Sequence, residues 1–385
     1  MHDEIAAVLQ AGARVVLADG CGTPVSLGPV LAEAARAVGG VRLLLGWCPE
    51  APVDVLDAAA FPDVVTVMGG YALRRPLRTG RVRSLPVRLG SVPALLAGAW
   101  RPDVVVAALR PGARGLVFGS EVGWMRAAVE SGAPVLAEVN HGLPDASDGV
   151  PVPPEQVVVV DEVDRAPFAF TTAPPNDEAR AIAEHVARLV PEGAVLQYGP
   201  GAVADAILCA LDVPVRVDSG LVGDAVLGLA ERGLLVGVPR GAYLAGTDAL
   251  YEWSNGRSIV ERLEVTHDVG RLARYDTFVA VNTALEIDAV GQVNVERAGD
   301  EPVGGIGGHA DFALAASRSP HGLSVIALPS THAGRCTLVP SLSAPVTTPR
   351  ADVDVVVTEH GVADLRGLDD RERAAALRHL WPDVT

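Results

Sequence analysis

Lysine is absent from this sequence, and its 31 basic residues are all arginines. Enzymes that form a Schiff base with a carbonyl substrate or with pyridoxal phosphate need a lysine amine for that bond. The phosphate-binding P-loop needs one as well, because its lysine contacts the nucleotide phosphates. The missing lysine therefore excludes all three kinds of site from these 385 residues.

Basic residues are also scarce relative to acidic ones, and the formal net charge is -16. Binding to nucleic acid depends on a basic face that neutralises phosphates, so we expect no nucleic-acid partner. Aromatic residues make up only 4% of the chain, too few for a surface on which bases stack. One arginine cluster runs from Arg74 to Arg88. It indicates either a solvated loop or a contact for a phosphorylated small molecule.

Long apolar runs are missing too, since no stretch approaches the roughly 18 uninterrupted apolar residues of a membrane span. The first residues include Asp3 and Glu4 and lack the apolar core of a signal peptide. The cysteines form no CxxC pair, which argues against a disulfide framework or a zinc site. They are Cys21, Cys48, Cys209 and Cys336. We therefore expect a cytoplasmic globular protein with no membrane contact and no metal.

Short apolar runs alternate with helix-length amphipathic segments along the first half of the chain. Strands that are apolar on both faces and separated by helices predict an α/β fold with mainly parallel sheets. The predicted strands are Val15–Ala18, Val41–Leu45, Val64–Met68, Val104–Ala107 and Pro134–Glu138. The predicted helices are Leu27–Val38, Val53–Ala60 and Val122–Ser131.

The second half repeats this pattern, and Thr171–Asp177 between the halves is typical of a crossover between domains. We therefore predict two α/β domains, 1–170 and 171–385. Asn176 or Asp177 is expected to cap the first helix of the second domain. The predicted strands are Ala194–Tyr198, Val213–Asp218, Phe278–Asn282, Leu323–Leu328 and Val353–Thr358. The predicted helices are Glu178–Leu189, Val203–Leu211, Leu221–Arg232 and Phe312–Ala316.

A glycine motif, Gly199-Pro200-Gly201-Ala202-Val203-Ala204, follows a predicted strand and opens a predicted helix. It fits the GxGxxA fingerprint of dinucleotide sites, and Asp218 at the end of the next strand is placed for a ribose. A glycine turn that lets the helix start close to the sheet explains the motif equally well. In both interpretations the free N–H groups of a helix N-terminus face a potential anion.

A second glycine motif, Gly304-Gly305-Ile306-Gly307-Gly308, precedes His309. Backbone N–H groups that no side chain blocks suit a pyrophosphate or a developing oxyanion. A flexible loop before a helix is the alternative.

Two further polar segments follow buried strands. The first contains Pro329-Ser330-Thr331-His332 and continues to Arg335, which can meet a phosphate or lie on a surface turn. The second is Thr358-Glu359-His360-Gly361, at a strand end of the kind where ligands gather in open sheets. No GxSxG elbow, HExxH motif or EF-hand loop is present.

Together these segments resemble the acetyl-CoA hydrolase/transferase family, which includes 4-hydroxybutyrate and related short-chain acyl-CoA transferases. The similar segments of the second half are LQYGPGAVADAIL (196–208), VNTALEIDAVGQVN (281–294), GGIGGHADFALAA (304–316), IALPSTH (326–332), VPSLSAPVTTPRADVDVVVTEHGVADLRG (339–367) and RERAAAL (371–377). Those of the first half are GRVRSLPVRLGSVPALL (80–96) and AEVNHGLPD (137–145). The resemblance implies two CoA-transferase-type α/β domains and a homodimer.

The resemblance also implies that the two glycine motifs contact coenzyme A or its thioester, which replaces the dinucleotide interpretation. Arg335 is also expected to contact a phosphate of coenzyme A. The predicted CoA-binding residues are Gly199, Gly201, Ala202, Val203, Gly305 and Arg335. The N–H groups near Gly307 and Gly308 are expected to stabilise the oxyanion.

The sequence departs from the family at the catalytic position. The transferases of this family act through a glutamate that attacks the thioester and forms an acyl anhydride, which divides a difficult transfer into easier steps. Here the corresponding segment reads Val217-Asp218-Ser219-Gly220-Leu221, and the similarity places Gly220 at the glutamate. Glycine cannot form an anhydride, so ordinary transfer through this position is excluded.

Two residues near this position are candidates for catalysis. Asp218 shares a strand face with Gly220 and is a displaced nucleophile, a general base for water, or only a helix N-cap or strand-end residue. His309 stands where the family usually has glutamine and either assists hydrolysis or only donates a hydrogen bond. Glu286 is interpreted as structural.

We therefore predict an acyl-CoA-acting enzyme that cleaves the thioester by hydrolysis or related chemistry. The first alternative is an acyl-CoA:carboxylate CoA-transferase in which Asp218 is the nucleophile. The second is a catalytically silent CoA-binding protein. The expected partners are an acyl-CoA and, for transfer, a small carboxylate.

Overall fold

The computed structural model describes residues 2–50 and 52–382, which form two compact units. The first unit holds the described residues up to Phe170 together with Gly241–Glu264 and Pro302–Gly307. The second holds Thr171–Arg240, Val265–Glu301 and the described residues from Gly308 onward. The chain thus passes between the units several times rather than once.

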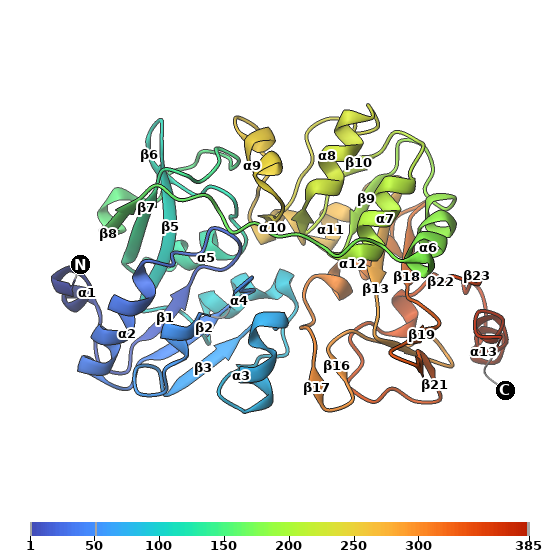
Figure 1. Cartoon of the computed structure of the whole chain (residues 1–385), viewed down its shortest axis with the longest axis horizontal. Coiled ribbons are helices and arrows are strands. Elements are labelled where there is room, and N and C mark those ends of the chain that lie inside the picture. The colour runs from blue at the N-terminus through green and yellow to red at the C-terminus, as the bar shows by residue number, and fades with distance from the viewer. Residues whose placement is uncertain (1, 51, 383–385) are drawn as a thin grey trace. The chain divides into compact units, whose positions relative to one another are not determined.

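The first unit is built on a sheet with strand order β4-β3-β2-β1-β5-β7-β8 (Figure 1). Neighbours in this order run parallel, and β6 pairs antiparallel with β5. The strands are β1 (Arg14–Leu17), β2 (Arg42–Leu45), β3 (Asp63–Thr66), β4 (Arg83–Ser84), β5 (Val104–Gly112), β6 (Gly115–Val117), β7 (Val135–Asn140), β8 (Val157–Val163) and, outside this sheet, β12 (Tyr243–Leu244). Every residue of β7 is buried, as expected for an inner strand of a parallel sheet.

The helices of the first unit are α1 (His2–Val8), α2 (Leu27–Val38), α3 (Arg74–Arg78), α4 (Val92–Ala97), α5 (Met125–Glu130) and α9 (Asp248–Ser254). Helix α2 has the predicted bounds, and its buried Leu27 and Leu31 lie four residues apart on the face that packs into the core. The predicted helix Val53–Ala60 is instead a short 3-10 helix, Val53–Leu56. It ends because the Asp57 carboxylate accepts a hydrogen bond from the N–H of Ala59, a local contact that competes with helix continuation.

Gly241–Glu264, which the sequence assigned to the 171–385 domain, packs with the first unit. The N–H of Leu244 donates to the carbonyl of Ser120 at 2.8 Å, and the N–H of Ile259 donates to that of Ala146 at 2.8 Å. These hydrogen bonds join segments more than 110 positions apart, and local sequence patterns carry no signal for them.

The second unit has a sheet with strand order β10-β9-β13-β18-β22-β23, parallel except for the final antiparallel pair. A smaller sheet has the order β15-β14-β21, and β19 and β20 form a hairpin. The strands are β9 (Val195–Tyr198), β10 (Arg216–Val217), β11 (Leu221–Val222), β13 (Phe278–Thr283), β14 (Glu286–Asp288), β15 (Val293–Asn294), β16 (Arg297–Ala298), β18 (Leu323–Ala327), β19 (Thr331–His332), β20 (Arg335–Cys336), β21 (Leu338–Val339), β22 (Val355–Thr358) and β23 (Gly361–Asp364), while β17 (Glu301–Pro302) spans the change of unit.

The helices of the second unit are α6 (Asp177–Ala187), α7 (Ala202–Ala210), α8 (Asp224–Glu231), α11 (Val269–Leu272), α12 (His309–Ala316) and α13 (Asp370–Arg378), while α10 (Leu263–Thr266) spans the change of unit. Helices α6 and α7 lie side by side, and α12 contacts β13 and β18 (Figure 1). Asn176 caps α6 as predicted, because its side chain accepts from the N–H of Ala179 at 2.9 Å. Helix α8 begins three residues later than predicted, since Leu221 and Val222 form β11.

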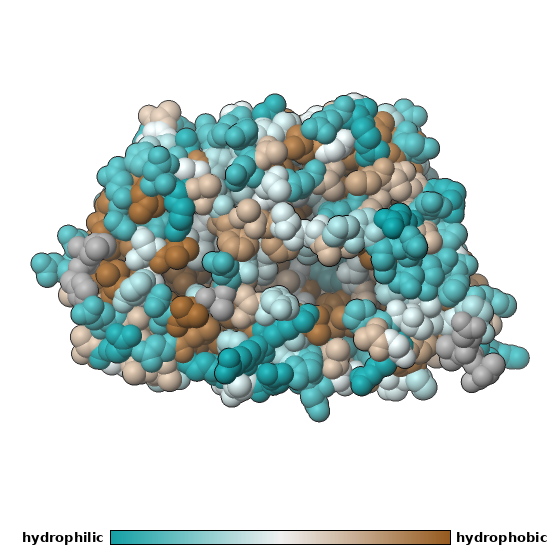
Figure 2. Space-filling view, in the orientation of Figure 1, coloured by the Kyte–Doolittle hydropathy of each residue, from teal (hydrophilic) through white to brown (hydrophobic). Residues whose placement is uncertain are grey.

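The mixed α/β architecture with mainly parallel sheets is therefore confirmed. On the face seen in Figure 2, hydrophilic residues are widely spread and smaller apolar areas lie between them. Among residues 2–50 and 52–382, no helix combines the length and the apolar character that a membrane crossing requires.

Candidate active site

The turn between β9 and α7 carries the first glycine motif. Gly201 has a φ of 123°, a conformation that favours glycine, and no side chain caps α7. A Cβ at Gly199 or Gly201 would meet no atom within 4 Å. Ala202 and Val203, which open the helix, are partly exposed. The predicted CoA contacts of this turn thus lie where an anion can approach the first N–H groups of α7.

The second glycine motif is a closely packed loop. A Cβ at Gly305 would lie 3.1 Å from the backbone nitrogen of Gly69 and 3.2 Å from Sδ of Met68. Gly307 has a φ of 60°, and its carbonyl accepts from the N–H of Leu89 at 2.9 Å. Tight packing therefore favours glycine at 305 and left-handed backbone favours it at 307, independently of any ligand.

Asp218 follows β10 and lies at the centre of a buried ion-pair network. Arg271 holds both carboxylate oxygens, with Nη1–Oδ2 at 2.6 Å and Nη2–Oδ1 at 2.9 Å. The Tyr275 hydroxyl donates to Oδ2 at 2.7 Å, and Arg240 Nη1 donates to the same oxygen at 3.2 Å. Asp218 is only 3% exposed. Four donor contacts, three of them to Oδ2, hold this carboxylate in place, which favours the strand-end role for Asp218.

Gly220 faces the imidazole ring of His267. A Cβ at position 220 would lie 3.4 Å from Cε1 and Nε2 of His267 and 3.5 Å from Cε2 of Phe312, which is ordinary contact. A one-carbon side chain therefore fits in ordinary contact with the ring. The nearby carboxylate of Asp218 is bound to Arg271.

His267 is buried, with 3% of its surface exposed. Its Nδ1 lies 2.9 Å from Oγ1 of Thr266, and its ring packs against Phe312 with centroids 4.6 Å apart. Its Nε2 is buried and has no hydrogen-bond partner among the described residues. Burial, helped by the positive charge of Arg271, lowers the pKa of His267 to about 3, so the imidazole is neutral at neutral pH.

Gly308 also borders this ring and caps α12. A Cβ there would come within 2.4 Å of Nε2 of His267 and 2.6 Å of Cε2 of Phe312. Gly220 and Gly308, which are distant in sequence, are therefore brought together around His267. Sequence reasoning missed this histidine, because Thr266-His267-Asp268 lies between periodic segments and matches no motif considered above.

His309 begins α12 and is partly buried. Its Nδ1 lies 2.6 Å from Oγ1 of Thr348. Burial lowers the pKa of His309 to about 4, although the backbone of Thr283 opposes this shift. A neutral, hydrogen-bonded His309 is the simpler of the two predicted roles.

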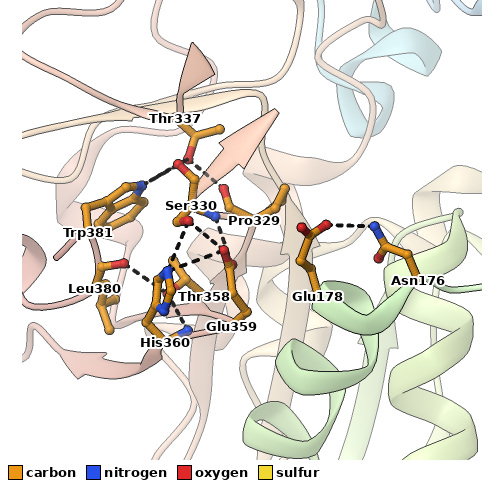
Figure 3. A network of polar contacts seen from close by, with 10 residues as sticks. All are labelled: Asn176, Glu178, Pro329, Ser330, Thr337, Thr358, Glu359, His360, Leu380 and Trp381. Carbon is orange, nitrogen blue, oxygen red and sulfur yellow. Dashed lines mark hydrogen bonds and ion pairs between the residues drawn. The ribbon is translucent and has the colours of Figure 1, made fainter. Parts of the chain in front are cut away.

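The two polar strand ends of the sequence meet in the second unit, because β18 and β22 are parallel neighbours. Glu359 accepts from the Ser330 hydroxyl at 2.5 Å and from the Ser330 N–H at 2.9 Å (Figure 3). His360 Nε2 lies 3.3 Å from the same hydroxyl, and Trp381 donates to the Ser330 carbonyl at 2.9 Å. Burial opposes ionisation of Glu359, but the hydrogen bonds from Ser330 outweigh it and lower its pKa. The cluster ties two strand ends to the C-terminal segment.

Two other predicted residues lie apart from this cluster. Arg335 is exposed on the β19–β20 hairpin. Glu286 accepts from Asn294 Nδ2 at 2.9 Å and from the N–H and hydroxyl of Ser343 at 2.7 and 2.9 Å. These bonds match the structural interpretation of Glu286.

Asp19 and Glu121 of the first unit are buried carboxyl groups with raised pKa values that the sequence analysis missed. Asp19 Oδ2 accepts from the Trp47 N–H at 3.0 Å, Trp124 Nε1 at 3.1 Å and the Tyr243 hydroxyl at 3.2 Å. Burial raises the pKa of Asp19 to about 6 and that of Glu121 to about 8. The sequence does contain a sign that Glu121 is buried, because it is a charged residue within the apolar run Val117–Trp124. Within the described ranges, no group of three or more His, Cys, Asp or Glu side chains is arranged to hold a metal ion.

Comparison with known proteins adds to this geometry. The model of the acetyl-CoA hydrolase/transferase C-terminal domain matches residues 246–380. The chain is 31% identical to the 4-hydroxybutyrate coenzyme A transferase of Clostridium kluyveri over 330 residues, covering 81% of this chain and 77% of that protein. It is 30% identical to the acetyl-CoA hydrolase of Saccharomyces cerevisiae over 259 residues, covering 59% of this chain and 47% of that protein.

A solved structure shows the fold over nearly the whole chain. RipA from Yersinia pestis superposes with a TM-score of 0.87 at 24% identity, covering 98% of this chain and 92% of that chain. With its two mainly parallel α/β units, the chain has the CoA-transferase fold. The chain belongs to the acetyl-CoA hydrolase/transferase family.

Proposed function

We propose that this enzyme hydrolyses the thioester of a short-chain acyl-CoA, giving the carboxylic acid and free coenzyme A. The observation that carries the proposal is glycine at position 220, where the family resemblance places the transferase glutamate. The neighbourhood supports it, because a side chain at 220 would point at His267 and the adjacent Asp218 is bound to Arg271. Hydrolysis needs no carboxylate of the enzyme to capture the acyl group, because water is the acceptor.

In this proposal the two glycine motifs bind the substrate. The β9–α7 turn, with Gly199, Gly201, Ala202 and Val203, presents helix N–H groups to the phosphates of coenzyme A. Gly305 and Arg335 are further proposed contacts. The N–H groups of Gly307 and Gly308 stabilise the oxyanion that forms when the carbonyl carbon is attacked.

CoA transfer to a small carboxylate is the second candidate, and the similarity to a 4-hydroxybutyrate coenzyme A transferase favours it. Transfer through Asp218 would require that carboxylate to leave Arg271, Arg240 and Tyr275. The two candidates differ in whether a carboxylate acceptor is needed.

The test is incubation of purified enzyme with acetyl-, propionyl-, butyryl- and 4-hydroxybutyryl-CoA in H₂¹⁸O, with and without acetate, followed by mass spectrometry. Hydrolysis predicts free coenzyme A at a rate independent of acetate, and one ¹⁸O atom in the released acid. A new acyl-CoA that forms only with acetate would replace this proposal with transfer. Unchanged thioesters, with calorimetric binding of coenzyme A, would instead identify a silent binding protein.

A further inference from the structure

We propose that His267 is a catalytic residue of this enzyme, and that its Nε2 takes the proton from the water that attacks the thioester carbonyl. This inference rests on the proposed hydrolysis and deepens it, because it names the group that acts in place of the missing glutamate. Four features of the second unit carry it: the position of the ring, its free nitrogen, its protonation state and the glycines that cover it.

The position of the ring is set by both neighbouring segments. A side chain at position 220 would point toward His267. Its Cβ atom would lie 3.4 Å from both Cε1 and Nε2 of the imidazole ring. The imidazole therefore borders the space in which the family places its reactive carboxylate. A group in contact with this space can also contact a water or thioester bound there.

The free nitrogen has no structural task in the described residues. Nδ1 of His267 pairs with Oγ1 of Thr266 and the ring packs on Phe312, which together set its orientation. Nε2 is buried and unpartnered. A buried polar atom without a partner costs free energy, roughly 1–3 kcal/mol in typical cases, so it calls for an explanation such as a bound water or substrate.

The glycines over the ring leave Nε2 covered by backbone rather than by side chains. Gly220 and Gly308 are both partly exposed, and a Cβ at Gly308 would approach Nε2 to 2.4 Å. Gly308 is also a proposed oxyanion donor. In this proposal the thioester carbonyl lies between the Gly308 N–H and Nε2, since Gly308 borders the ring.

The protonation state fits a proton acceptor. The pKa of about 3 leaves the Nε2 lone pair able to accept a proton at neutral pH but makes it a weak base, so its contribution comes chiefly from its position beside the attacking water rather than from its basicity. Water oxygen bonds to the carbonyl carbon while its proton moves to Nε2. The C–S bond then breaks and the proton passes from Nε2 to the leaving sulfur, which yields the acid and the free thiol.

Asp218 acts in this scheme as a positioning residue. Its carboxylate pairs with Arg271, whose positive charge lowers the pKa of His267. Neutralising Asp218 would leave that charge less balanced and make Nε2 a weaker base. Asp218→Asn is therefore expected to lower kcat by about tenfold with little change in KM.

The deciding experiment compares acyl-CoA hydrolysis by wild type, His267→Asn and the surface control His321→Asn. We expect His267→Asn to lose about 100-fold or more in kcat, in the range typical of a lost general base, with KM within about threefold. His321 is 73% exposed, so His321→Asn should stay within about twofold. A folded His267→Asn that hydrolyses within threefold of wild type would overturn the role of His267 but not the hydrolysis. A wild type that transfers without hydrolysing would overturn the proposed function itself.

A second variant guards against loss of folding in His267→Asn. Gly220→Ala adds one methyl in ordinary contact with His267, so the fold should persist while the methyl occupies space beside Nε2. We expect kcat to fall about tenfold or more, whereas Gly228→Ala, an open helical position, should leave it unchanged. Unchanged turnover in a folded Gly220→Ala enzyme would mean that His267 only packs there.

Discussion

At the scale of the residue, Gly308 controls how closely the backbone approaches His267. Its missing side chain lets Nε2 lie against the start of α12. Cores filled at close packing tolerate added atoms poorly, because neighbours must move or change rotamer. The requirement for glycine at 308 therefore follows from packing, whichever reaction the enzyme performs.

Gly308→Ala is expected to destabilise the protein by about 1–3 kcal/mol, because the new Cβ would lie 2.4 Å from Nε2 of His267 and 2.6 Å from Phe312. Urea unfolding measures the change. Gly228→Ala in α8 is the matched control: with no atom within 4 Å of the new Cβ, it should stabilise by roughly 0.5–1 kcal/mol. Equal effects of the two variants would contradict the packing argument.

Glu121 links stability to pH. Its pKa is about 8 in the folded chain because burial disfavours the charged form, against an ordinary value of 4.5. Glu121 therefore makes its full contribution to the free energy of unfolding below pH 4.5, where it is neutral in both states. This contribution is lost as the pH rises through about 8. Asp19 adds a loss of the same sign between 3.8 and about 6.

Glu121→Gln should therefore raise the free energy of unfolding more at pH 8 than at pH 5, approaching about 1.4 kcal/mol per pH unit within this window. Urea unfolding at both pH values gives the difference. Glu155→Gln, at an exposed position, serves as the control and should show no such pH dependence. A Gln variant that gains nothing at pH 8 would show that Glu121 is ionised in the fold.

At the scale of the element, the β19–β20 hairpin presents Arg335 through a two-residue turn, Ala333-Gly334. Among the described residues, Ala333 is the positive-φ residue that is not glycine, with a φ of 49°. A left-handed conformation strains an alanine, whereas Asn-Gly is the favoured pair in such turns.

Ala333→Asn is expected to raise stability by about 0.5 kcal/mol, and Ala333→Val to lower it, because a β-branched side chain resists positive φ. Thermal unfolding of the two variants measures both signs. The same direction of change for both would indicate that the turn adopts another conformation in solution.

At the scale of the whole molecule, chain order and structural unit do not coincide. Gly241–Glu264 lies within the second half of the sequence but belongs to the first unit. Ile259 and Val260 of this segment are buried, at 0% and 1% exposure. A fragment that contains the segment without the first 170 residues would expose these side chains.

The fragment 171–385, expressed alone, is therefore expected to be unstable or aggregated, and co-expression with residues 1–170 should restore a soluble complex. Gel filtration and near-UV circular dichroism check both statements. A monomeric, fully folded 171–385 fragment would show that Gly241–Glu264 is not needed where the structure places it.

The sequence alone determined the α/β class, a cap for α6 at Asn176 or Asp177, and the family resemblance. These features rest on local patterns: hydrophobic periodicity, turn residues and motifs are written in neighbouring positions. The bounds of α2 follow from such a pattern. The shorter Val53–Leu56 helix does not, because an Asp57 side-chain contact competed with the periodic signal.

Only the tertiary structure decided which of these residues meet. Strand order brings Ser330 to Glu359 across β18 and β22, and packing of α12 brings Gly308 and Gly220 to His267. Asp218 pairs with Arg271, which lies 53 positions away in the sequence. Contacts between distant segments depend on how elements pair and pack, which neighbouring residues do not encode, and the proposed site around His267 is made of such contacts.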